Sequence, residues 1–232
     1  MIDRTLNYGR HHIRNFLGAA TPYSTVLDIG AGRGDDLALA QKIQPGAQLH
    51  AIEVQKESAM HLAKQGIAVH NLNIERDPFP LTDESMDVVL ANQILEHTKE
   101  LFWIFHEVSR VLREGGSLIV GVPNLASLHN RLLLLFGRQP TSLQNASAHV
   151  RGYTKSDIMR MFAMVFPDGY LLRNSGGSNF YPFPPALARP LAAALPGMAW
   201  GIFLRLEKRQ PYSRQFLEFP TRANLETNFF VG

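Results

Sequence analysis

Two patterns of apolar and polar residues, one typical of strands and one of helices, alternate along the first half of the chain. Short apolar runs rich in Val, Ile and Leu predict buried strands, and the stretches between them have the spacing of amphipathic helices. The predicted strands are Ser24–Ile29, Gln48–Glu53, Ile67–Leu72, Met86–Ala91 and Gly116–Val122, and the predicted helices are Asp35–Lys42, Glu57–Lys64 and Lys99–Arg113. Strands that alternate with helices in this way indicate βαβ units and a doubly wound α/β fold with a parallel sheet.

The second half has a less regular pattern. Leu125–Phe136 has the apolar character of a helix, and a polar linker, residues 137–147, follows it. Thr154 with Asp157 three residues later is a helix N-cap pattern, which predicts a helix that runs to Phe166. Further strands are predicted at Gly169–Asn174 and Trp200–Leu206, and loops at Ser175–Asn179 and Pro182–Pro185. The tail after Pro211 fits no pattern.

Composition narrows the class of protein. With 232 residues, 45% hydrophobic and 19% charged, the chain is expected to form one packed domain. It has no cysteine, which excludes disulfides, thiolate zinc sites, cysteine nucleophiles and cysteine-held iron–sulfur clusters. The N-terminal segment lacks the apolar core of a signal peptide, and no run of about 18 residues is apolar throughout. The sequence therefore favours a cytoplasmic protein without a transmembrane helix.

The charge is distributed unevenly. Residues 1–150 hold 13 Lys and Arg against 15 Asp and Glu, whereas residues 151–232 hold 10 against 5, so the net charges are −2 and +5. A basic C-terminal third suits an anionic substrate or a lipid surface, and it suits a solvated face equally well. Peripheral membrane contact is therefore left open and is not favoured.

The strongest local signal is the glycine-rich stretch Val26–Asp35, which lies between the first predicted strand and the first predicted helix. Gly30, Gly32 and Gly34 allow the backbone to approach a ligand at the carboxyl end of the strand, where doubly wound sheets bind their ligands. Glu53 ends the next strand, where a carboxylate can accept hydrogen bonds from both hydroxyls of a ribose.

Two kinds of cofactor suit this design. The dinucleotide fingerprint is G-x-G-x-x-G, and here the third glycine, Gly34, comes one position early. Asp28, two residues before Gly30, offers a pyrophosphate little. A cationic ligand explains Asp28 better, and S-adenosylmethionine carries a sulfonium and an α-ammonium without any phosphate.

At four places the sequence resembles the class I S-adenosylmethionine-dependent methyltransferases, in particular the group that modifies small molecules, lipids and glycans. The motifs are Val26–Asp35; the strand end Ile52–Val54; Asn73–Glu75 followed by Pro78–Leu81, Asp83 and Ser85–Val89; and Leu95–His97 with Arg110–Gly116. The resemblance implies a Rossmann-like, mostly parallel seven-stranded sheet with an antiparallel last strand. It also implies an N-terminal lid (residues 1–20), a cofactor-binding core (21–123), a substrate-side insert (124–152) and an acceptor pocket within residues 153–232 of a single domain.

The resemblance also assigns residues to S-adenosylmethionine. The cofactor-binding candidates are Asp28, Gly30, Ala31, Gly32, Glu53, Val54, Asn73, Ile74, Glu75, Asn92 and Gln93. Arg10 or Arg14, in the N-terminal segment that commonly covers the cofactor in this family, is a candidate partner for its carboxylate. His97 and His149 are candidate bases, although each can equally order the structure around it. Arg151 and Tyr153 are candidate substrate contacts, or they order their own loop.

The expected reaction is an in-line transfer of a methyl group to an oxygen or nitrogen of a small molecule, a sugar or a lipid-linked acceptor. Four alternatives bear on this prediction. DNA is not expected, because Ala91–Ile94 lacks the proline and aromatic residues that clamp a flipped base. RNA methylation at a ribose or ring nitrogen stays open. A nicotinamide-dependent oxidoreductase and a non-catalytic binding protein are disfavoured. No metal is expected, since the adjacent His11 and His12 diverge on a helix.

Overall fold

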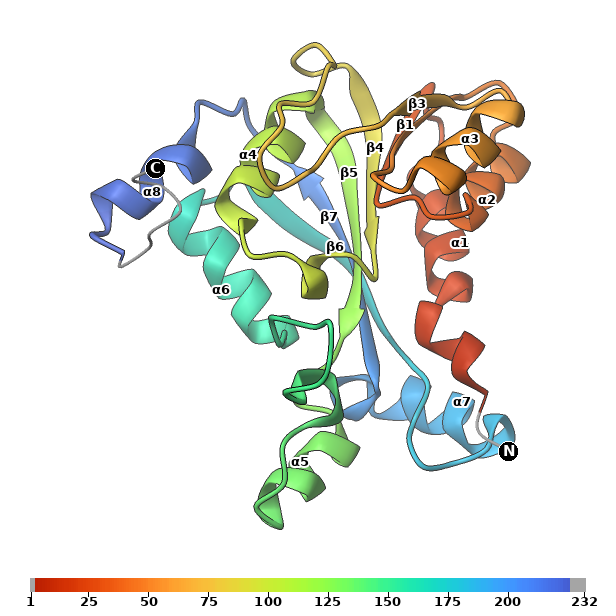
Figure 1. Cartoon of the computed structure of the whole chain (residues 1–232), viewed down its shortest axis with the longest axis vertical. Helices are drawn as coiled ribbons and strands as arrows, with labels where there is room; N and C mark the ends of the chain where they lie inside the picture. The colour runs from red at the N-terminus through yellow and green to blue at the C-terminus, as the bar shows by residue number, and fades with distance from the viewer. Residues whose placement is uncertain (1–2, 226–232) are drawn as a thin grey trace.

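The computed structural model describes residues 3–225, and a seven-stranded sheet runs through its middle (Figure 1). The strands are β1 (Thr25–Ile29), β2 (Gln48–Ile52), β3 (Ala68–His70), β4 (Met86–Asn92), β5 (Leu112–Pro123), β6 (Tyr170–Ser178) and β7 (Gly201–Lys208). Their order is β3-β2-β1-β4-β5-β7-β6, with β7 antiparallel to both of its neighbours and the other pairs parallel. The doubly wound sheet with an antiparallel last strand is thereby confirmed.

Helices cover both faces of the sheet. One face carries α1 (Arg10–Ala19), α2 (Asp35–Ile43) and α3 (Lys56–Lys64); the other carries α4 (Leu101–Val111), α6 (Lys155–Val165) and α8 (Gln215–Arg222) (Figure 1). Beyond the sheet lie α5 (Leu128–Leu135) and α7 (Pro185–Ala194), and short 3-10 turns are η1 (Arg4–Tyr8), η2 (Leu95–His97), η3 (Thr141–Leu143) and η4 (Pro196–Met198). No helix in the described part of the chain is long and apolar enough to cross a membrane.

The two faces build separate cores. On the α4 side, Phe105, Phe162 and Phe216 pack ring against ring with centroids 4.9 to 5.6 Å apart. On the α1 side, Ile13 and Leu37 pack against the other face. Both faces of β7 are covered, so its sequence is almost continuously buried rather than alternating.

The strand at the sheet edge corrects one prediction. Ser175–Asn179 was expected to be a loop because of its two glycines, but β6 continues to Ser178 and pairs with β7 throughout. The glycines serve close packing: a Cβ on Gly176 would lie 2.2 Å from the His12 ring, and one on Gly177 would lie 2.6 Å from Ala199. The two glycines allow neighbouring residues to pack closely against the strand, and they do not form a turn.

Several predicted boundaries are confirmed and others shift. The Thr154 hydroxyl accepts the Asp157 N–H at 3.1 Å and caps α6. The helix predicted at Leu125–Phe136 is shorter, because Ser127 is the N-cap of α5. The tail after Pro211 contains α8, whose Phe216 and Phe219 enter the core; residues 226–232 lie outside the described residues.

A buried cation ties the end of β7 to the end of α4, the start of β5 and the segment before β4. The Lys208 ammonium is fully buried and donates to the carbonyls of Leu112 at 2.7 Å and Ser109 at 3.0 Å, and to the Glu84 carboxylate at 3.1 Å. If the ammonium is removed, solvent does not reach these two buried carbonyls to replace its hydrogen bonds.

We expect Lys208→Met to lower the free energy of unfolding by about 2–4 kcal/mol, because a buried acceptor left unpaired costs about 1–3 kcal/mol. Urea denaturation followed by circular dichroism measures the change. Lys42→Met, at an exposed position in α2, is the matched control and is expected to shift stability very little. Equal stability of the two variants would contradict this role of Lys208.

Candidate functional site

The glycine loop leaves β1 in left-handed backbone conformations. Gly30, Gly32 and Gly34 have φ angles of +74°, +54° and +83°. A Cβ on Gly30 would lie 2.6 Å from Ile94, whereas one on Gly32 would meet no atom within 4 Å. Gly30 is therefore required by packing, while Gly32 faces open space in which a ligand can approach the backbone.

Four N–H groups of the loop are already occupied by protein partners. Gly30 and Ala31 donate to the Ile52 carbonyl at 2.8 and 3.3 Å, and Gly34 donates to the Ala31 carbonyl at 2.9 Å. The N–H of Gly32 donates to the Glu53 carboxylate at 2.7 Å. These four donors have protein partners and are therefore not available to a pyrophosphate.

Glu53 is buried at the end of β2, with 6% of its surface exposed. Its second carboxylate oxygen accepts the Gln55 N–H at 2.7 Å. Each carboxylate oxygen can accept more than one hydrogen bond, so the group is fixed in place and keeps capacity for two hydroxyls. This position is the one the sequence assigned to a ribose.

Two cavities meet at the loop and share Gly30 and Gly32. One has a volume of about 480 Å³ and the other about 300 Å³. The first is lined by Gly30, Gly32, Glu53, Val54, Asn73, Ile74, Glu75 and His97 among others, and the second by Asp28, Gly30, Ala31, Gly32, Asn92 and Gln93 among others. Every residue that the sequence assigned to the cofactor thus lies on one of these two cavities.

The larger cavity is apolar with polar edges. Ile52, Leu72, Ile74 and Ile94 supply its apolar walls. Val54, 63% exposed, stands at its rim. Such a surface suits the flat faces of a base.

The backbone of the nearby loops is held by its own side chains. The Asn73 amide oxygen accepts the Glu75 N–H at 2.9 Å. The Glu75 carboxylate accepts the N–H groups of Lys99 and Glu100, at 2.5 and 3.2 Å, at the start of α4. Glu75 therefore orders the chain beside the cavity, and a contact between its carboxylate and a ligand stays a prediction.

The smaller cavity is acidic. Burial, and then the charges of Asp36 and Glu53, raise the pKa of Asp28 well above its ordinary value. Burial also raises the pKa of Asp36, against the Asn92 hydrogen bond at 2.7 Å and the charge of Arg10. A cation placed among these carboxylates would favour their charged forms.

Unpaired polar atoms mark the same cavity. Gln93 Nε2 is a buried donor and Asn92 Oδ1 a buried acceptor without a hydrogen-bond partner, whereas Arg10 Nε and Asp36 Oδ1 form an ion pair with each other at 3.7 Å. An α-amino acid group needs acceptors for its ammonium and donors for its carboxylate. The residues therefore fit the methionine end of S-adenosylmethionine, as the larger cavity fits its adenosine end.

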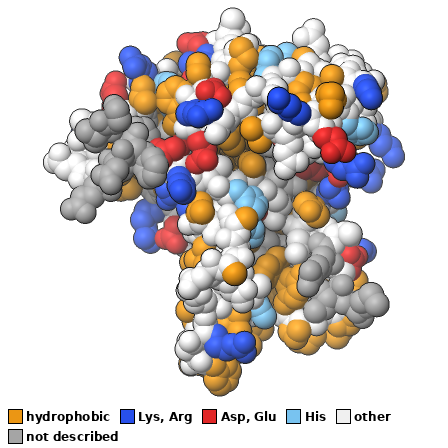
Figure 2. Space-filling model, in the orientation of Figure 1, with side chains coloured by type: hydrophobic (Ala, Val, Ile, Leu, Met, Phe, Trp, Pro, Cys, Tyr) orange, Lys and Arg blue, Asp and Glu red, His pale blue; other side chains and the backbone are white. Residues whose placement is uncertain are grey.

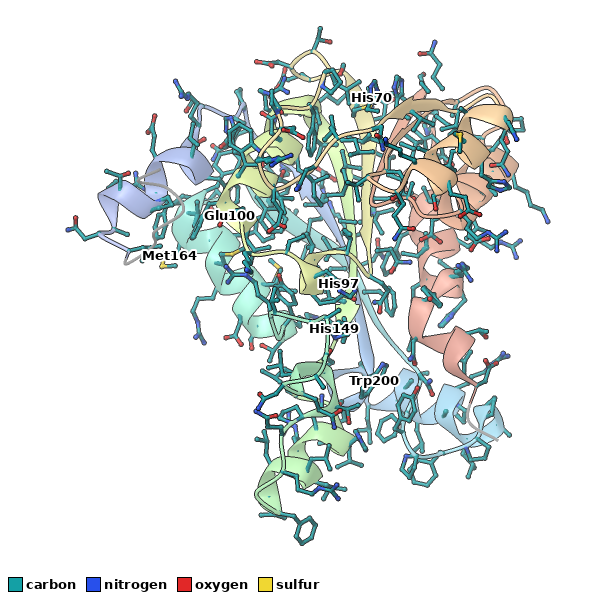
Figure 3. All side chains as sticks on the ribbon, in the orientation of Figure 1. His70, His97, Glu100, His149, Met164 and Trp200 are labelled. Carbon is teal, nitrogen blue, oxygen red and sulfur yellow. The ribbon has the colours of Figure 1, made fainter. Side chains whose placement is uncertain are left out.

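The structure brings the two candidate bases together. His97 lines the larger cavity, and its ring meets that of His149 edge-on, with centroids 4.7 Å apart (Figure 3). Burial, and then the charge of His97, lower the pKa of His149. Next to them, burial raises the pKa of Glu96 to about 7. A role for either histidine as a base stays a prediction.

Arg151 and Tyr153 contact the protein itself. The Arg151 guanidinium donates to the carbonyls of Thr98 and Lys99 at 3.3 and 2.5 Å, and the Tyr153 hydroxyl donates to the Leu95 carbonyl at 3.0 Å. Neither side chain lines the two cavities at the glycine loop. These contacts order the loop, one of the two roles that the sequence left open.

Sequence reasoning missed Asp36 and gave Glu96 no role. Asp36 follows Asp35 in the first turn of α2, where acidic residues are common for the helix dipole alone, so its burial left no signal. Glu96 follows the apolar Leu95 and precedes His97, in a motif from which the sequence indicates only the histidine as a functional candidate. An acidic residue at an apolar position was the available sign.

Comparison with known proteins gives a consistent picture. The profile of the methyltransferase domain family matches residues 27–120. An arsenite methyltransferase of Halobacterium salinarum is 31% identical over 109 residues, which is 44% of this chain and 28% of that protein. A ribosomal RNA large subunit methyltransferase G of Colwellia psychrerythraea is 31% identical over 154 residues, 60% of this chain and 39% of that protein. The chain spans about a third of the length of the first curated relatives it matches.

Solved structures extend the likeness to the whole fold. A SAM-dependent methyltransferase from Archaeoglobus fulgidus matches with a TM-score of 0.59 at 14% identity, over 86% of this chain and 93% of the other. The plantazolicin methyltransferase in complex with SAH matches with a TM-score of 0.61 at 17% identity, over 89% and 86%. At these identities the likeness concerns the fold alone. Residues 27–120 therefore match the methyltransferase domain family, and the chain as a whole shares the fold of solved S-adenosylmethionine-dependent methyltransferases.

Proposed function

We propose that this chain is an enzyme that transfers a methyl group from S-adenosylmethionine to an oxygen or nitrogen of a small molecule, a sugar or a lipid-linked acceptor. One observation carries the proposal. The N–H groups of Gly30, Ala31, Gly32 and Gly34 in the loop are occupied by protein partners, and three buried carboxylates, Asp28, Asp36 and Glu53, lie around it. Such a site repels phosphates and attracts a cation.

The chain's own residues have distinct tasks in this proposal. S-adenosylmethionine, when bound, supplies a methyl group on a positively charged sulfur, which needs no covalent enzyme intermediate. Glu53 holds the ribose hydroxyls, and Asp28 and Asp36 balance positive charge. The apolar walls of the larger cavity exclude water and orient the donor, which is the main contribution that such a displacement requires. His97, at the cavity edge, is the residue that we place beside the acceptor.

Methylation of RNA is a second candidate. The match to the ribosomal RNA methyltransferase covers more of this chain than the other curated match reported above. The +5 charge of residues 151–232 suits a nucleic-acid backbone as well as a lipid surface. Assays with small acceptors and with ribosomal RNA as parallel substrates separate these two candidates.

The insert supports an acceptor presented at a lipid surface. Leu135 and Phe136, at the end of α5, are each 75% exposed, and apolar side chains beside Lys or Arg form the tip at the lower end of the molecule (Figure 2). Residues 115–156 contain no Asp or Glu and include Arg131 and Arg138. Exposed apolar side chains flanked by arginines suit the interface of an anionic bilayer.

The glycine loop provides the first test. Gly32→Ala places a Cβ in the open space where the donor would lie, and we expect it to weaken binding of S-adenosylmethionine at least about 10-fold in calorimetry. Gly66→Ala is the matched control: it introduces the same left-handed strain (φ +80°) in open space, outside the two cavities. A wild-type chain that binds NADH and ignores S-adenosylmethionine would refute the proposed function.

The acidic cavity provides a second test. A folded-state pKa raised above the unfolded one means that stability is complete below the unfolded pKa and is lost as the pH rises through the folded pKa. Asp28→Asn removes this loss, so we expect its ligand-free melting temperature to exceed wild type by about 2–4 °C at pH 7–8, which is about 1 kcal/mol for a domain of this size. The difference shrinks as the pH falls towards the ordinary aspartate range.

The same variant is expected to lose most of the thermal stabilisation that S-adenosylmethionine gives the wild type, because an amide does not balance a cation. Asp168→Asn, an exposed position where asparagine tolerates the positive φ, is the control and is expected to keep wild-type behaviour in both measurements. A variant that is less stable than wild type at every pH would show that the Asp28 charge is not a cost.

The insert provides a third test. We expect the chain to float with vesicles that contain phosphatidylglycerol at low salt, and to be released at high salt. The double variant Leu135→Gln/Phe136→Gln is expected to stay unbound, whereas Met60→Gln, which changes an exposed side chain on α3, is expected to bind as wild type does. Binding that ignores both the salt and the double variant would rule out the insert as the contact.

A further inference from the structure

A buried carboxylate oxygen without a hydrogen-bond partner belongs to Glu96, next to His97, which lines the larger cavity. Glu96, in η2, is 1% exposed, and its Oε2 atom has no hydrogen-bond partner. A buried acceptor with no donor is rare in folded proteins, because the loss of water is not compensated. η2 connects β4 to α4 at the carboxyl ends of the strands, where such sheets bind their ligands. A ligand that contacts this carboxylate would therefore explain its unpaired oxygen.

Two imidazoles face the same place with their ring nitrogens in a defined state. His97 Nδ1 lies 3.3 Å from the Ala148 carbonyl, and His149 Nδ1 lies 3.1 Å from the Ser142 carbonyl. A carbonyl only accepts, so each Nδ1 carries the proton and donates it. In the neutral ring each Nε2 is left with a lone pair, which is the form in which histidine binds a metal ion, and the carbonyl contacts are those that orient metal-binding histidines.

Main-chain hydrogen bonds hold the three side chains together. The N–H groups of Val150 and Arg151 donate to the Glu96 carbonyl at 2.8 and 3.3 Å, which joins the insert to η2 directly beside His149. One potential ligand atom from each of Glu96, His97 and His149 lies within 4.8 Å of the other two. This is the only group of three such residues in the part of the chain that the structure describes.

We propose that Glu96, His97 and His149 bind a divalent transition-metal ion of the zinc class. Two imidazoles and a carboxylate form a set that suits Zn²⁺, and three protein ligands leave at least one position open. The ion explains the unpaired carboxylate oxygen, the two oriented imidazoles and their position between cavity and insert.

The open coordination position of the ion is available to a substrate. His97 also lines the cavity that contains Gly32 and Glu53, so an ion on its ring lies at the boundary between the donor site and the insert. This second step rests on the proposed function: a hydroxyl of the acceptor that occupies the open position becomes more acidic and releases its proton to water, which leaves an alkoxide ready for methylation. The acceptor class is then a hydroxyl compound, and the histidines act as ligands rather than as bases.

Binding is tested on the full-length chain after treatment with a chelator. Titration calorimetry with Zn²⁺ is expected to show one ion per chain, and Co²⁺ is expected to give visible absorption bands in its place. Glu96→Gln and His149→Ala are each expected to weaken Zn²⁺ binding by about 100-fold or more, because each removes a direct ligand. Circular dichroism checks that each variant folds, and Glu96→Gln, which keeps the side-chain shape, tests the site even where His149→Ala does not fold.

Other histidines supply the control. His61, exposed on α3 and outside the cluster, can bind zinc only adventitiously, so His61→Ala is expected to bind as wild type does. The His50 and His70 rings stack 5.9 Å apart on β2 and β3, so His70→Ala identifies binding at that pair. No stoichiometric binding, or binding that is unaffected by Glu96→Gln and His149→Ala, would overturn the site.

The two proposals fail separately. Binding of S-adenosylmethionine is measured by calorimetry on the metal-free and the zinc-loaded chain. Zinc binding that depends on Glu96 and His149 in a chain that does not bind S-adenosylmethionine would leave the metal site standing and refute the methyl transfer. Binding of S-adenosylmethionine without any zinc site would do the reverse.

Discussion

The hydrogen bond from the Gly32 N–H to the Glu53 carboxylate is the interaction on which the site depends. At 2.7 Å it joins the loop after β1 to the end of β2, and it gives the loop a negatively charged partner from within the protein. A donor used in this way is not available to a phosphate, and a second negative charge beside Glu53 is disfavoured. The N–H of Gly32 therefore has a protein partner and is not free to bind a phosphate.

The segment that follows β4 couples this loop to the rest of the site. Gln93 has a φ of +57°, rare outside glycine, and its N–H donates to the Gly121 carbonyl at 2.7 Å. Within the next five residues, Ile94 packs on Gly30, Glu96 binds the insert through its carbonyl, and His97 and Thr98 line the larger cavity. A ligand that shifts this segment acts on the donor site and on the insert together, because the chain between them is too short to move independently.

The sequence predicts this half of the molecule well for a physical reason. Buried parallel strands require nearly continuous apolar runs, and the ligand edge requires glycine and a carboxylate at fixed strand ends, so the positions of Gly30, Gly32 and Glu53 follow from the pattern alone. The other half is set by contacts between distant residues. The glycines at 176 and 177 are small because His12 and Ala199 approach them, and nothing near them in the sequence indicates that. Likewise Glu96 and His149 meet only through the insert, whose path no local pattern encodes.

The buried charges indicate what the fold is adapted to hold. Asp28, Asp36 and Glu96 all have a raised pKa, with burial as the first cause, so ionising each of them costs the ligand-free protein stability as the pH rises. Selection for stability alone would replace these three carboxylates. The apolar side chains buried in the cores on both faces of the sheet offset the stability that is lost. Asp28 lies at the end of β1, Asp36 at the start of α2 and Glu96 just after β4, so all three are near the carboxyl ends of the parallel strands. Cations bound at that edge, an organic one among the aspartates and a metal ion beside Glu96, would turn this local instability into binding energy.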